Sequence, residues 1–437
     1  MRDFLPEDVR RREYVIGKIK NVYERYGFEP LETPAVENLE TLMGKYGEEG
    51  NRLIFKILKR GEHEATGQAD LALRYDLTVP LARVIAEHRA KLPRLFKRYQ
   101  VQAVWRADRP ARGRFREFFQ CDVDALGSRS PVVEAELCAA ASDALEDLGF
   151  TDFVIRLNHR ELLTAILESA GISPALHGEA LVALDKLDKI GRDGVASELS
   201  ARGVDGAAGE RLLSFFQDFA ADGGGLSRIA AFVGGHAAGG EAVRNVEAIL
   251  SLSQDTSAKG RIRLDPSLAR GLSYYTGAIM EINVPDLVGS LGGGGRYDDL
   301  VGMFSGESIP ACGFSLGLER ILVVMGERGM FPAALKTNPA DVMVAAFDAA
   351  GLPHALRVAA ELRAADLRVF VYPDPDKIGK QLKYAEGRGI PCVAILGENE
   401  IERGEVTIKH LGTRQQVVQA QAGAGDVVKR MLETERG

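Results

Sequence analysis

The chain has 437 residues, 46% of them hydrophobic and 27% charged, which is an ordinary composition for a globular protein of two or three domains. Its formal net charge of -7 argues against a protein that coats nucleic acid without sequence preference. No apolar run approaches the roughly 18 residues that a membrane span needs, and the opening residues carry no signal-like apolar segment, so we expect no membrane contact and a cytoplasmic location.

The N-terminal third of the chain predicts a helix followed by strands. Residues 12–26 carry apolar side chains at helical spacing and run into a proline-bounded strand. Residues 52–61 and 71–80 have the pattern of strands. Pro80 is predicted to open a helix, because its missing N–H costs nothing in the first helical turn. Residues 94–127 alternate in the manner of a long hairpin.

The middle of the chain changes character. From residue 158 to about 258, short amphipathic helices are broken by glycine-rich joints, which predicts a helical insert. Strands are predicted again at 261–268, 273–284 and 311–315, and a helix follows at 316–326.

The C-terminal quarter predicts a separate unit. Residues 326–340 have the composition of a linker, and three apolar strands separated by two helical patterns follow it, which is typical of a small α/β unit of about 100 residues. The cysteines form no C-x-x-C pair, so neither a zinc site nor a disulfide framework is indicated, and we expect them to be reduced and mostly buried. They are Cys121, Cys138, Cys312 and Cys392.

Polar side chains gather on one face of the predicted hairpin. Successive strand residues face opposite sides of a sheet, so even and odd positions separate. Most even positions are polar in both arms of the hairpin and in the strand before it, whereas the odd positions are mostly apolar. The polar members are Arg98, Gln100, Gln102, Arg106 and Asp108 in the first arm, Arg114, Arg116, Gln120, Asp122 and Asp124 in the second, and Arg74, Asp76 and Thr78 in the preceding strand.

Two interpretations of this face stay open. It could be the solvated side of an antiparallel sheet, and the nine Lys and Arg against one Asp between Lys91 and Arg116 could be an ordinary solvated surface. However, a solvated face usually mixes Lys, Glu, Thr and Ser. Here arginines, which suit bidentate phosphate contacts, recur with amides and short carboxylates that could hold an amine or an imidazole. This set of side chains favours a site for a polyphosphate and a small cationic or amphoteric molecule.

Two further segments have unusual compositions. The run SLGGGGRYDD, residues 290–299, lacks the spacing of the known nucleotide-binding loops, so it is either a flexible loop or a strand stripped of side chains because a ligand lies against its backbone. In LARGLSYYTG, Arg270 stands beside a glycine and two tyrosines, which is poor composition for a core or a linker. Arg320, at the start of a predicted helix, could be a surface ion-pair partner.

Motifs of covalent catalysis are missing from the sequence. The seven histidines are dispersed, none lies in H-E-x-x-H, and neither a G-x-S-x-G elbow nor a Cys/His pair is indicated by spacing. We therefore expect chemistry that needs no nucleophile from the protein.

The motifs of the chain resemble those of the histidyl-tRNA synthetase family, within the class II aminoacyl-tRNA synthetases, over essentially its whole length. GFEPLETPAVE is similar to motif 1, which ends at Pro34, and FKRYQVQAVWRADRPARGRFREFFQCDVDALG is similar to motif 2. ACGFSLGLERIL resembles motif 3, with Arg320 in the expected place. LARGLSYYTG and GGGGRYDDLV are similar to the two signatures that are specific to the histidine enzymes and their relatives.

The resemblance implies an α+β catalytic domain, an antiparallel sheet flanked by helices, that is interrupted by a helical insert and followed by an α/β anticodon-binding domain. The implied ranges are 1–157 and 259–330 for the two parts of the catalytic domain, 158–258 for the insertion, and 339–437 for the anticodon-binding domain. It also implies a homodimer formed through motif 1.

Site roles follow from the resemblance, position by position. Arg106 and Arg320 would hold the α- and γ-phosphates of ATP with help from Arg114, and Asp108 would meet the adenine amine. Arg270 would be the catalytic arginine at the α-phosphate. The histidine pocket, to which Arg270 would also contribute, would be lined by Asp76, Thr78, Gln120, Asp124, Tyr274 and Tyr275, with Asp124 and nearby hydroxyls pairing the imidazole nitrogens.

The implied reaction is the activation of L-histidine by ATP to histidyl adenylate, with Mg²⁺ on the β- and γ-phosphates, and transfer to the 3′ end of histidine tRNA. The alternative is a catalytically inert paralogue that senses histidine, such as the regulatory subunit of ATP phosphoribosyltransferase. Such paralogues generally lack the anticodon-binding domain and the phosphate-binding arginines, both of which this sequence keeps. Ser273 departs from the family pattern, which usually has Asp at that place, and the motif 2 loop lacks the glutamine-bearing form common in bacterial members.

Overall fold

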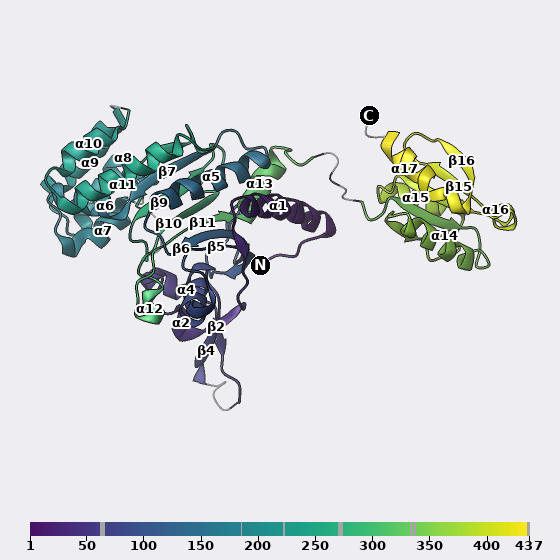
Figure 1. The fold of residues 1–437 in the computed structure, drawn as a ribbon, viewed down its shortest axis with the longest axis horizontal. Helices are drawn as coiled ribbons and strands as arrows, with labels where there is room; N and C mark the ends of the chain where they lie inside the picture. Colours follow the sequence, from purple (N-terminus) through teal and green to yellow (C-terminus); the bar gives the residue numbers. More distant parts are fainter. Residues whose placement is uncertain are drawn as a thin grey trace. The chain divides into compact units, whose positions relative to one another are not determined.

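The computed structural model describes residues 1–61, 66–184, 186–221, 223–269, 274–332, 335 and 338–434. The chain divides into two compact units, and each has hydrophobic cores of its own (Figure 1). The first unit takes residues 1–3 and 11–331, and the second takes residues 4–10 and 332–437.

The first unit is built on an eight-stranded sheet of order β1-β5-β6-β11-β10-β9-β7-β8. Neighbouring strands are antiparallel except at the two edges, where β1 pairs with β5 and β8 pairs with β7 in parallel. The strands are β1 (Glu29–Pro30), β5 (Phe96–Trp105), β6 (Glu117–Leu126), β7 (Val154–His159), β8 (Ile262–Leu264), β9 (Ala278–Asn283), β10 (Gly292–Arg296) and β11 (Ala311–Gly317).

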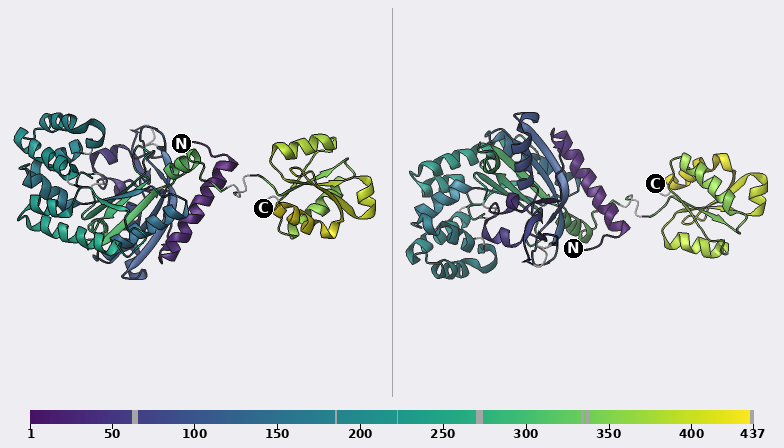
Figure 2. Two further views of the ribbon diagram at one scale, coloured as in Figure 1. Left: turned by 90° about the horizontal axis from the view of Figure 1, so that it is seen from above. Right: turned by 90° about the horizontal axis from the view of Figure 1, so that it is seen from below.

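One face of this sheet is covered by the helices α1 (Pro6–Arg25), α5 (Val132–Asp147) and α13 (Leu318–Glu327) (Figure 2). The apolar side chains of α1 recur every three or four residues, so Val15, Ile19 and Val22 lie on one side of the helix and are fully buried. They pack in one core with residues such as Val123 and Phe314 from the sheet. The predicted helix at the N-terminus is therefore confirmed, and its apolar stripe is what attaches it to the sheet.

The opposite face of the sheet is polar, as the alternation predicts. In the β5–β6 hairpin Gln100 lies opposite Asp122 and Gln102 opposite Gln120, while Ser315 of β11 is the other neighbour of Asp122. These positions share one side of the pleat, because side chains alternate along every strand. The predicted hairpin is confirmed, and its polar side chains stand together.

A small sheet of order β2-β4-β3 and several short helices lie beside the large sheet. They are β2 (Val36–Asn38), β3 (Lys56–Leu58), β4 (Ala69–Leu73), α2 (Leu39–Leu42), α3 (Gly47–Arg52), α4 (Thr78–His88) and α12 (Gly302–Ser305). The expectation that Pro80 opens α4 was wrong by two residues. The carboxylate of Asp76 accepts the N–H of Val79 at 3.0 Å, and this bond satisfies an amide of the first turn, so the helix begins at Thr78.

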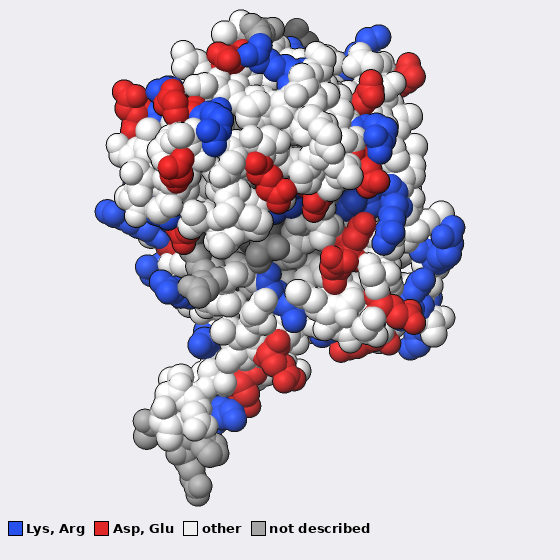
Figure 3. All heavy atoms as spheres, turned by 90° about the vertical axis from the view of Figure 1, so that its left-hand side faces the viewer, with Lys and Arg blue, Asp and Glu red and all other residues white. Residues whose placement is uncertain are grey.

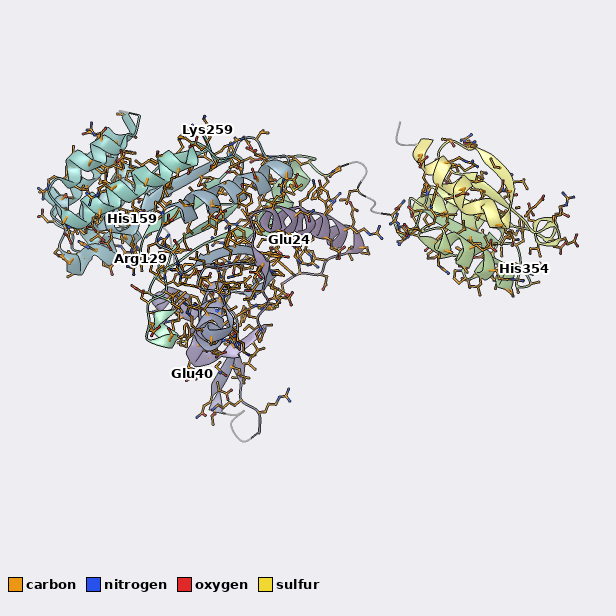
Figure 4. All side chains as sticks on the ribbon, in the orientation of Figure 1. Glu24, Glu40, Arg129, His159, Lys259 and His354 are labelled. Atoms are coloured by element: carbon orange, nitrogen blue, oxygen red, sulfur yellow. The ribbon has the colours of Figure 1, made fainter. Side chains whose placement is uncertain are left out.

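In the described part of the chain between β7 and β8, six α-helices form a layer with a core of its own. They are α6 (Arg160–Ser169), α7 (His177–Leu184), α8 (Leu187–Ala201), α9 (Gly206–Ala221), α10 (Leu226–Val233) and α11 (Ala237–Ser253). His159, labelled in Figure 4, ends β7, and its Nδ1 accepts the N–H of Glu161, which caps α6. Burial lowers the pKa of His159 to about 4, so the ring is neutral and able to accept at pH 7.

On the face shown in Figure 3, acidic and basic side chains are interspersed.

The second unit has a five-stranded sheet of order β13-β12-β14-β15-β16, with the first three strands parallel. Its interior strand β12 is buried on both faces: Val342 and Val344 belong to one core and Met343 to another. The elements are β12 (Val342–Ala346), β13 (Val369–Val371), β14 (Cys392–Leu396), β15 (Glu405–His410), β16 (Gln416–Ala420), α14 (Leu352–Ala364), α15 (Ile378–Gly387), α16 (Glu398–Arg403) and α17 (Ala424–Thr434).

All four cysteines are free and buried, as predicted. Within the described part of the chain, no helix has the length and apolar character of a membrane span.

Candidate active site

The polar face of the large sheet carries a cavity of about 380 Å³. Its walls come from segments far apart in the sequence: the turn into α4, the loop between β5 and β6, strands β10 and β11, and the start of α13. Every predicted site residue that the structure describes lines it, namely Asp76, Thr78, Arg106, Asp108, Arg114, Gln120, Asp124, Tyr274, Tyr275 and Arg320. Arg270 and Ser273 lie outside the described residues.

Arg106 follows β5 directly and is held from two sides. Its Nε donates to the carbonyl of Tyr75 at 3.0 Å. Its guanidinium lies over the Tyr75 ring at 4.3 Å and over the Phe118 ring at 5.2 Å, and such stacking suits the planar group. The side chain is thus oriented before any ligand arrives.

Arg320 and Arg114 line the same part of the cavity, because Gly113 lets the β5–β6 loop lie close to Arg320. Gly113 in the β5–β6 loop has φ +67°, and a Cβ there would lie 3.1 Å from Cγ of Arg320. Glycine therefore lets the loop pass over the first turn of α13 in a left-handed conformation. Arg320 donates to the carbonyl of Ser290, while Arg114, next to Gly113, is exposed. We refer to Arg106, Asp108, Arg114 and Arg320 as the loop end of the cavity.

Asp76 organises the opposite wall. Its Oδ1 accepts hydrogen bonds from the Tyr46 hydroxyl and from the N–H of Val79, both at 3.0 Å, and its Oδ2 accepts from the Tyr274 hydroxyl at 3.1 Å. Burial raises the pKa of Asp76, while these bonds and the charge of Arg106 lower it. Burial also raises the pKa of Tyr274 well above its ordinary value, so the phenol stays a donor.

Asp124 is bound from two sides by buried groups. Its Oδ1 accepts a hydrogen bond from the Tyr297 hydroxyl, and its Oδ2 forms an ion pair with Nη2 of Arg98 at 2.8 Å. Arg98 is fully buried, so its charge acts with little screening by solvent. Burial raises the pKa of Asp124, and Arg98 lowers it.

Asp122 lies between Gln120 and Asp124 on the same face of β6 and is 2% exposed. Its Oδ1 has no hydrogen-bond partner. Burial raises the pKa of Asp122, and the charge of Arg98 and a hydrogen bond with Ser315 oppose the rise. Ser315 also accepts from Nε2 of Gln120 at 3.0 Å. We refer to Asp76, Asp122, Asp124, Tyr274 and Tyr297 as the inner end of the cavity.

The glycine run forms part of the floor. It is strand β10, so the strand interpretation of residues 290–299 is confirmed for Gly292–Arg296 and the flexible-loop interpretation was wrong there. A Cβ on Gly294 would lie 2.1 Å from the carbonyl oxygen of Gly313, whereas a Cβ on Gly293 would meet only the carbonyl of Met280, at 3.3 Å. Gly293 therefore leaves open space above the sheet inside the cavity.

Glu319 contributes a further buried carboxylate. It lies beside Arg320 at the start of α13, lines the cavity and accepts the N–H of Phe119 through Oε2 at 2.9 Å. Burial raises the pKa of Glu319 to about 7. Among the described residues that line the cavity there is no His, Cys or Lys, so the described wall offers none of those nucleophiles. The arrangement suits an anionic ligand at the loop end and a hydrogen-bond donor at the inner end.

Comparisons with known proteins agree with the division of the chain into two units. A family model described as histidyl-tRNA synthetase matches residues 1–321, and a second, described as anticodon binding domain, matches residues 341–431. The chain belongs to the histidyl-tRNA synthetase family. The predicted class II synthetase fold, with its large sheet flanked by helices and a separate C-terminal anticodon-binding domain, is thereby confirmed.

Individual members of the histidyl-tRNA synthetase family match over almost their full length. A histidine–tRNA ligase of Christiangramia forsetii is 41% identical over 95% of each chain, and one of Gloeobacter violaceus is 40% identical over 99% of this chain and 97% of its own. The crystal structure of histidyl-tRNA synthetase from Nostoc sp. PCC 7120 superposes with a TM-score of 0.80 at 33% identity, covering 98% of this chain and 97% of that one.

Sequence reasoning toward this synthetase site missed several of the residues that build it. Tyr46 and Tyr297 hold two of the predicted carboxylates, and no local pattern distinguishes either tyrosine from a core residue. Asp122 was placed on the polar face by strand parity but received no role. Arg98, on the same face, does not line the cavity: it lies beneath the site and neutralises Asp124.

Proposed function

We propose that the cavity is the site at which this synthetase activates L-histidine. The chain is a ligase: it joins histidine to ATP as histidyl adenylate, releases pyrophosphate, and transfers the histidyl group to the 3′ end of histidine tRNA. The observation that carries the assignment of the site is its polarity. Arg106, Arg114 and Arg320 line one end, and buried carboxylates and tyrosines line the other.

In the first step the substrate supplies the nucleophile. The histidine carboxylate attacks the α-phosphorus of ATP in line, a new P–O bond forms, and pyrophosphate leaves. The protein supplies position and positive charge where negative charge develops. We assign Arg106 and Arg270 to the α-phosphate and Arg320 to the γ-phosphate, with Arg114 assisting from the loop and Asp108 accepting from the adenine amine. Guanidinium groups serve this role without titrating near neutral pH.

Mg²⁺ accompanies ATP in this proposal. In the described part of the chain, no group of three or more His, Cys, Asp or Glu side chains is arranged to hold a metal ion. The carboxylates of Glu281 and Glu319 line the cavity, and one or two carboxylates together with substrate phosphates are the usual protein environment of Mg²⁺. The residues present thus fit a metal ion that enters on the β- and γ-phosphates, where it would neutralise charge on the leaving pyrophosphate.

The histidine pocket occupies the inner end. Asp76, Thr78 and Gln120 are proposed to receive the substrate amine, and Asp124, Tyr274 and Tyr275 to surround the imidazole ring. Tyr274 is fixed by its bond to Asp76, and its ring meets that of Tyr275 edge to face at 5.1 Å between centroids. An amino acid without ring N–H groups would leave buried polar atoms unpaired, which is a strong basis for rejection.

The remaining assignments concern the whole enzyme. We propose domain ranges of 1–157 and 259–330 for catalysis, 158–258 for the helical insertion and 339–437 for anticodon binding. The second unit would contact histidine tRNA through exposed bases, as is usual for single-stranded RNA. A homodimer formed through the motif 1 segment and a cytoplasmic location, where its tRNA is used, complete the proposal.

The deciding experiment is histidine-dependent exchange of labelled pyrophosphate into ATP. The full-length chain is expected to catalyse this exchange with L-histidine and not with proline, threonine or glycine. An inert histidine-sensing paralogue would bind histidine without exchange, and exchange with another amino acid would contradict the proposed pocket.

A further inference from the structure

The buried carboxylates at the inner end differ in how many of their oxygen atoms already have a partner in the protein. Asp76 accepts three hydrogen bonds from the protein, and Asp124 accepts from Tyr297 and pairs with Arg98. Asp122 keeps Oδ1 without a hydrogen-bond partner although it is 2% exposed. An unpartnered buried carboxylate oxygen is costly, so its presence in a cavity points to a donor that arrives with a ligand.

The sheet register places open space beside this oxygen. Across the sheet, Asp122 of β6 lies opposite Ser315 of β11, and Ser315 lies opposite Gly293 of β10. In the next row Asp124 lies opposite Gly313, where a Cβ would be only 1.8 Å from Oδ1 of Asp124, so the Asp124 carboxylate already fills the space over its neighbour. The floor formed by Ser315 and Gly293 is not filled in this way.

We propose that Asp122 is a specificity-determining residue, whose free carboxylate oxygen accepts an N–H of the imidazole ring of the bound histidine. This inference rests on the proposed function of the cavity. It adds a second acceptor to the pocket, in a position where the ring can lie flat over Gly293.

The direction of the substrate in the cavity favours the ring over the amine. The reacting carboxylate of histidine must meet the α-phosphate at the loop end, beside Arg106. Along β6, Gln120 is nearer to that loop than Asp122 by two residues, or about 7 Å of strand. The amine is attached next to the carboxylate and therefore falls near Gln120. The ring, one side-chain length farther in, falls near Asp122.

Charge at the inner end supports the same assignment. Asp122 and Asp124 share one buried guanidinium, that of Arg98, while the charge acting on Asp76 is that of Arg106, and burial raises the pKa of each carboxylate. A ring N–H supplies the missing donor to Asp122, and a side chain that lacks it leaves the oxygen unpaired. Charge-assisted hydrogen bonds of this kind are about twice as strong as neutral ones.

The test uses the full-length chain and isothermal titration calorimetry with three probes: L-histidine, imidazolepropionate, which lacks the amine, and ATP with Mg²⁺. Asp122→Asn keeps the shape of the side chain and removes its charge. It is expected to weaken both L-histidine and imidazolepropionate by about 10- to 100-fold, the scale of a hydrogen bond to a charged group, and to leave ATP binding unchanged.

Asp341→Asn serves as the matched control, because Asp341 is also a buried carboxylate in an ion pair but belongs to the second unit. It is expected to bind all three probes as the wild type does. If Asp122→Asn does not bind ATP, Asp122→Ser, which is smaller and uncharged, takes its place.

The outcomes distinguish the proposed role of Asp122 from the proposed function of the cavity. Unchanged binding of both imidazole probes to Asp122→Asn would overturn the inference, and so would a loss confined to L-histidine, since that pattern assigns Asp122 to the amine. Failure of the wild type to bind L-histidine at all would instead overturn the proposed function, and this inference with it.

Discussion

Two arginines at the two ends of α13, Arg320 and the C-cap residue Arg328, have different surroundings. Arg320, in the first turn, lines the cavity and lies under Gly113 of the motif 2 loop. Arg328, at the end of the same helix, forms ion pairs with Asp152 and Asp286 on the surface. Of the two, Arg320 lines the cavity, and we therefore assign the proposed contact with phosphate to Arg320 and not to Arg328.

Arg320→Ala is expected to reduce histidine-dependent pyrophosphate exchange by roughly 10²- to 10³-fold, the scale for losing one preorganised charge donor. The measurement is the exchange rate at saturating histidine, together with the KM for ATP. Arg328→Ala is the matched control and should retain the wild-type rate, because its partners lie outside the cavity. Equal rates in the two variants would remove Arg320 from the proposed mechanism.

Glu319 predicts a pH dependence of stability. Its pKa rises from 4.5 to about 7 in the folded state, mainly through burial. The folded state therefore holds the proton more tightly, and the stabilisation it provides is present below pH 4.5 and is lost as pH rises through 7. The difference of about 2.5 units corresponds to about 3 kcal/mol, as an order of magnitude.

Glu319→Gln should remove this dependence, because an amide does not ionise. The gap between the Tm of the variant and that of the wild type is expected to move in favour of the variant between pH 5 and pH 8, as measured by differential scanning calorimetry. A gap that stays constant over this range would contradict the assignment.

At the scale of the element, β10 uses its glycines for two different purposes. Gly292 and Gly294 are needed for close packing, since a Cβ on either would approach a backbone carbonyl of β11 to 2.5 Å or 2.1 Å. Gly295 is similarly restricted by the carbonyl of Ala278, at 2.5 Å. Gly293 alone among the four has space for a Cβ with a small adjustment. Its missing side chain keeps the cavity open.

Alanine at two neighbouring glycines should therefore have different effects, one on stability and the other on histidine binding. Gly294→Ala is expected to lower the free energy of unfolding by about 1 to 3 kcal/mol or more, the usual cost of overpacking. Gly293→Ala should change stability by less than about 1 kcal/mol and raise the KM for histidine about tenfold, because the new methyl group occupies the floor of the pocket. Thermal melts and exchange kinetics on both variants check this; a stable Gly293→Ala with wild-type KM would place the substrate elsewhere.

At the scale of the molecule, the two units have separate hydrophobic cores. The sheet of the second unit is buried on both faces by its own helices, and no described strand of the first unit pairs with it. The described residues that line the cavity all belong to the first unit. We therefore assign the proposed activation of histidine to the first unit and the proposed recognition of the anticodon to the second.

Truncation after Phe331 is expected to separate these steps. The shortened chain should keep pyrophosphate exchange within about tenfold of the full chain, since the cavity is retained, and should lose most aminoacylation of histidine tRNA, since recognition of anticodon bases contributes much of tRNA affinity. Exchange and aminoacylation are measured in parallel on both chains. Equal losses of both activities would show that the second unit is needed for the first step as well.

Local pattern in the sequence determined much of this architecture. The alternation of polar and apolar residues predicted the β5–β6 hairpin and the polar face that carries the cavity, because side chains alternate strictly along a strand. This alternation depends on residues close together in sequence, so it is visible in the sequence itself. The resemblance of the motifs to those of the histidyl-tRNA synthetases implied the overall fold and the described residues that line one cavity.

The partner of each buried charged side chain was decided only by the tertiary structure. Asp76 is held by Tyr274, 198 residues away, and Arg98 neutralises Asp124 on the neighbouring strand while Asp122, two residues away, keeps a free oxygen. Parity placed Arg98, Asp122 and Asp124 on one face as equals. Which carboxylate is neutralised and which stays open to a ligand depends on strand register, on burial and on side chains from distant segments, and no local periodicity encodes these.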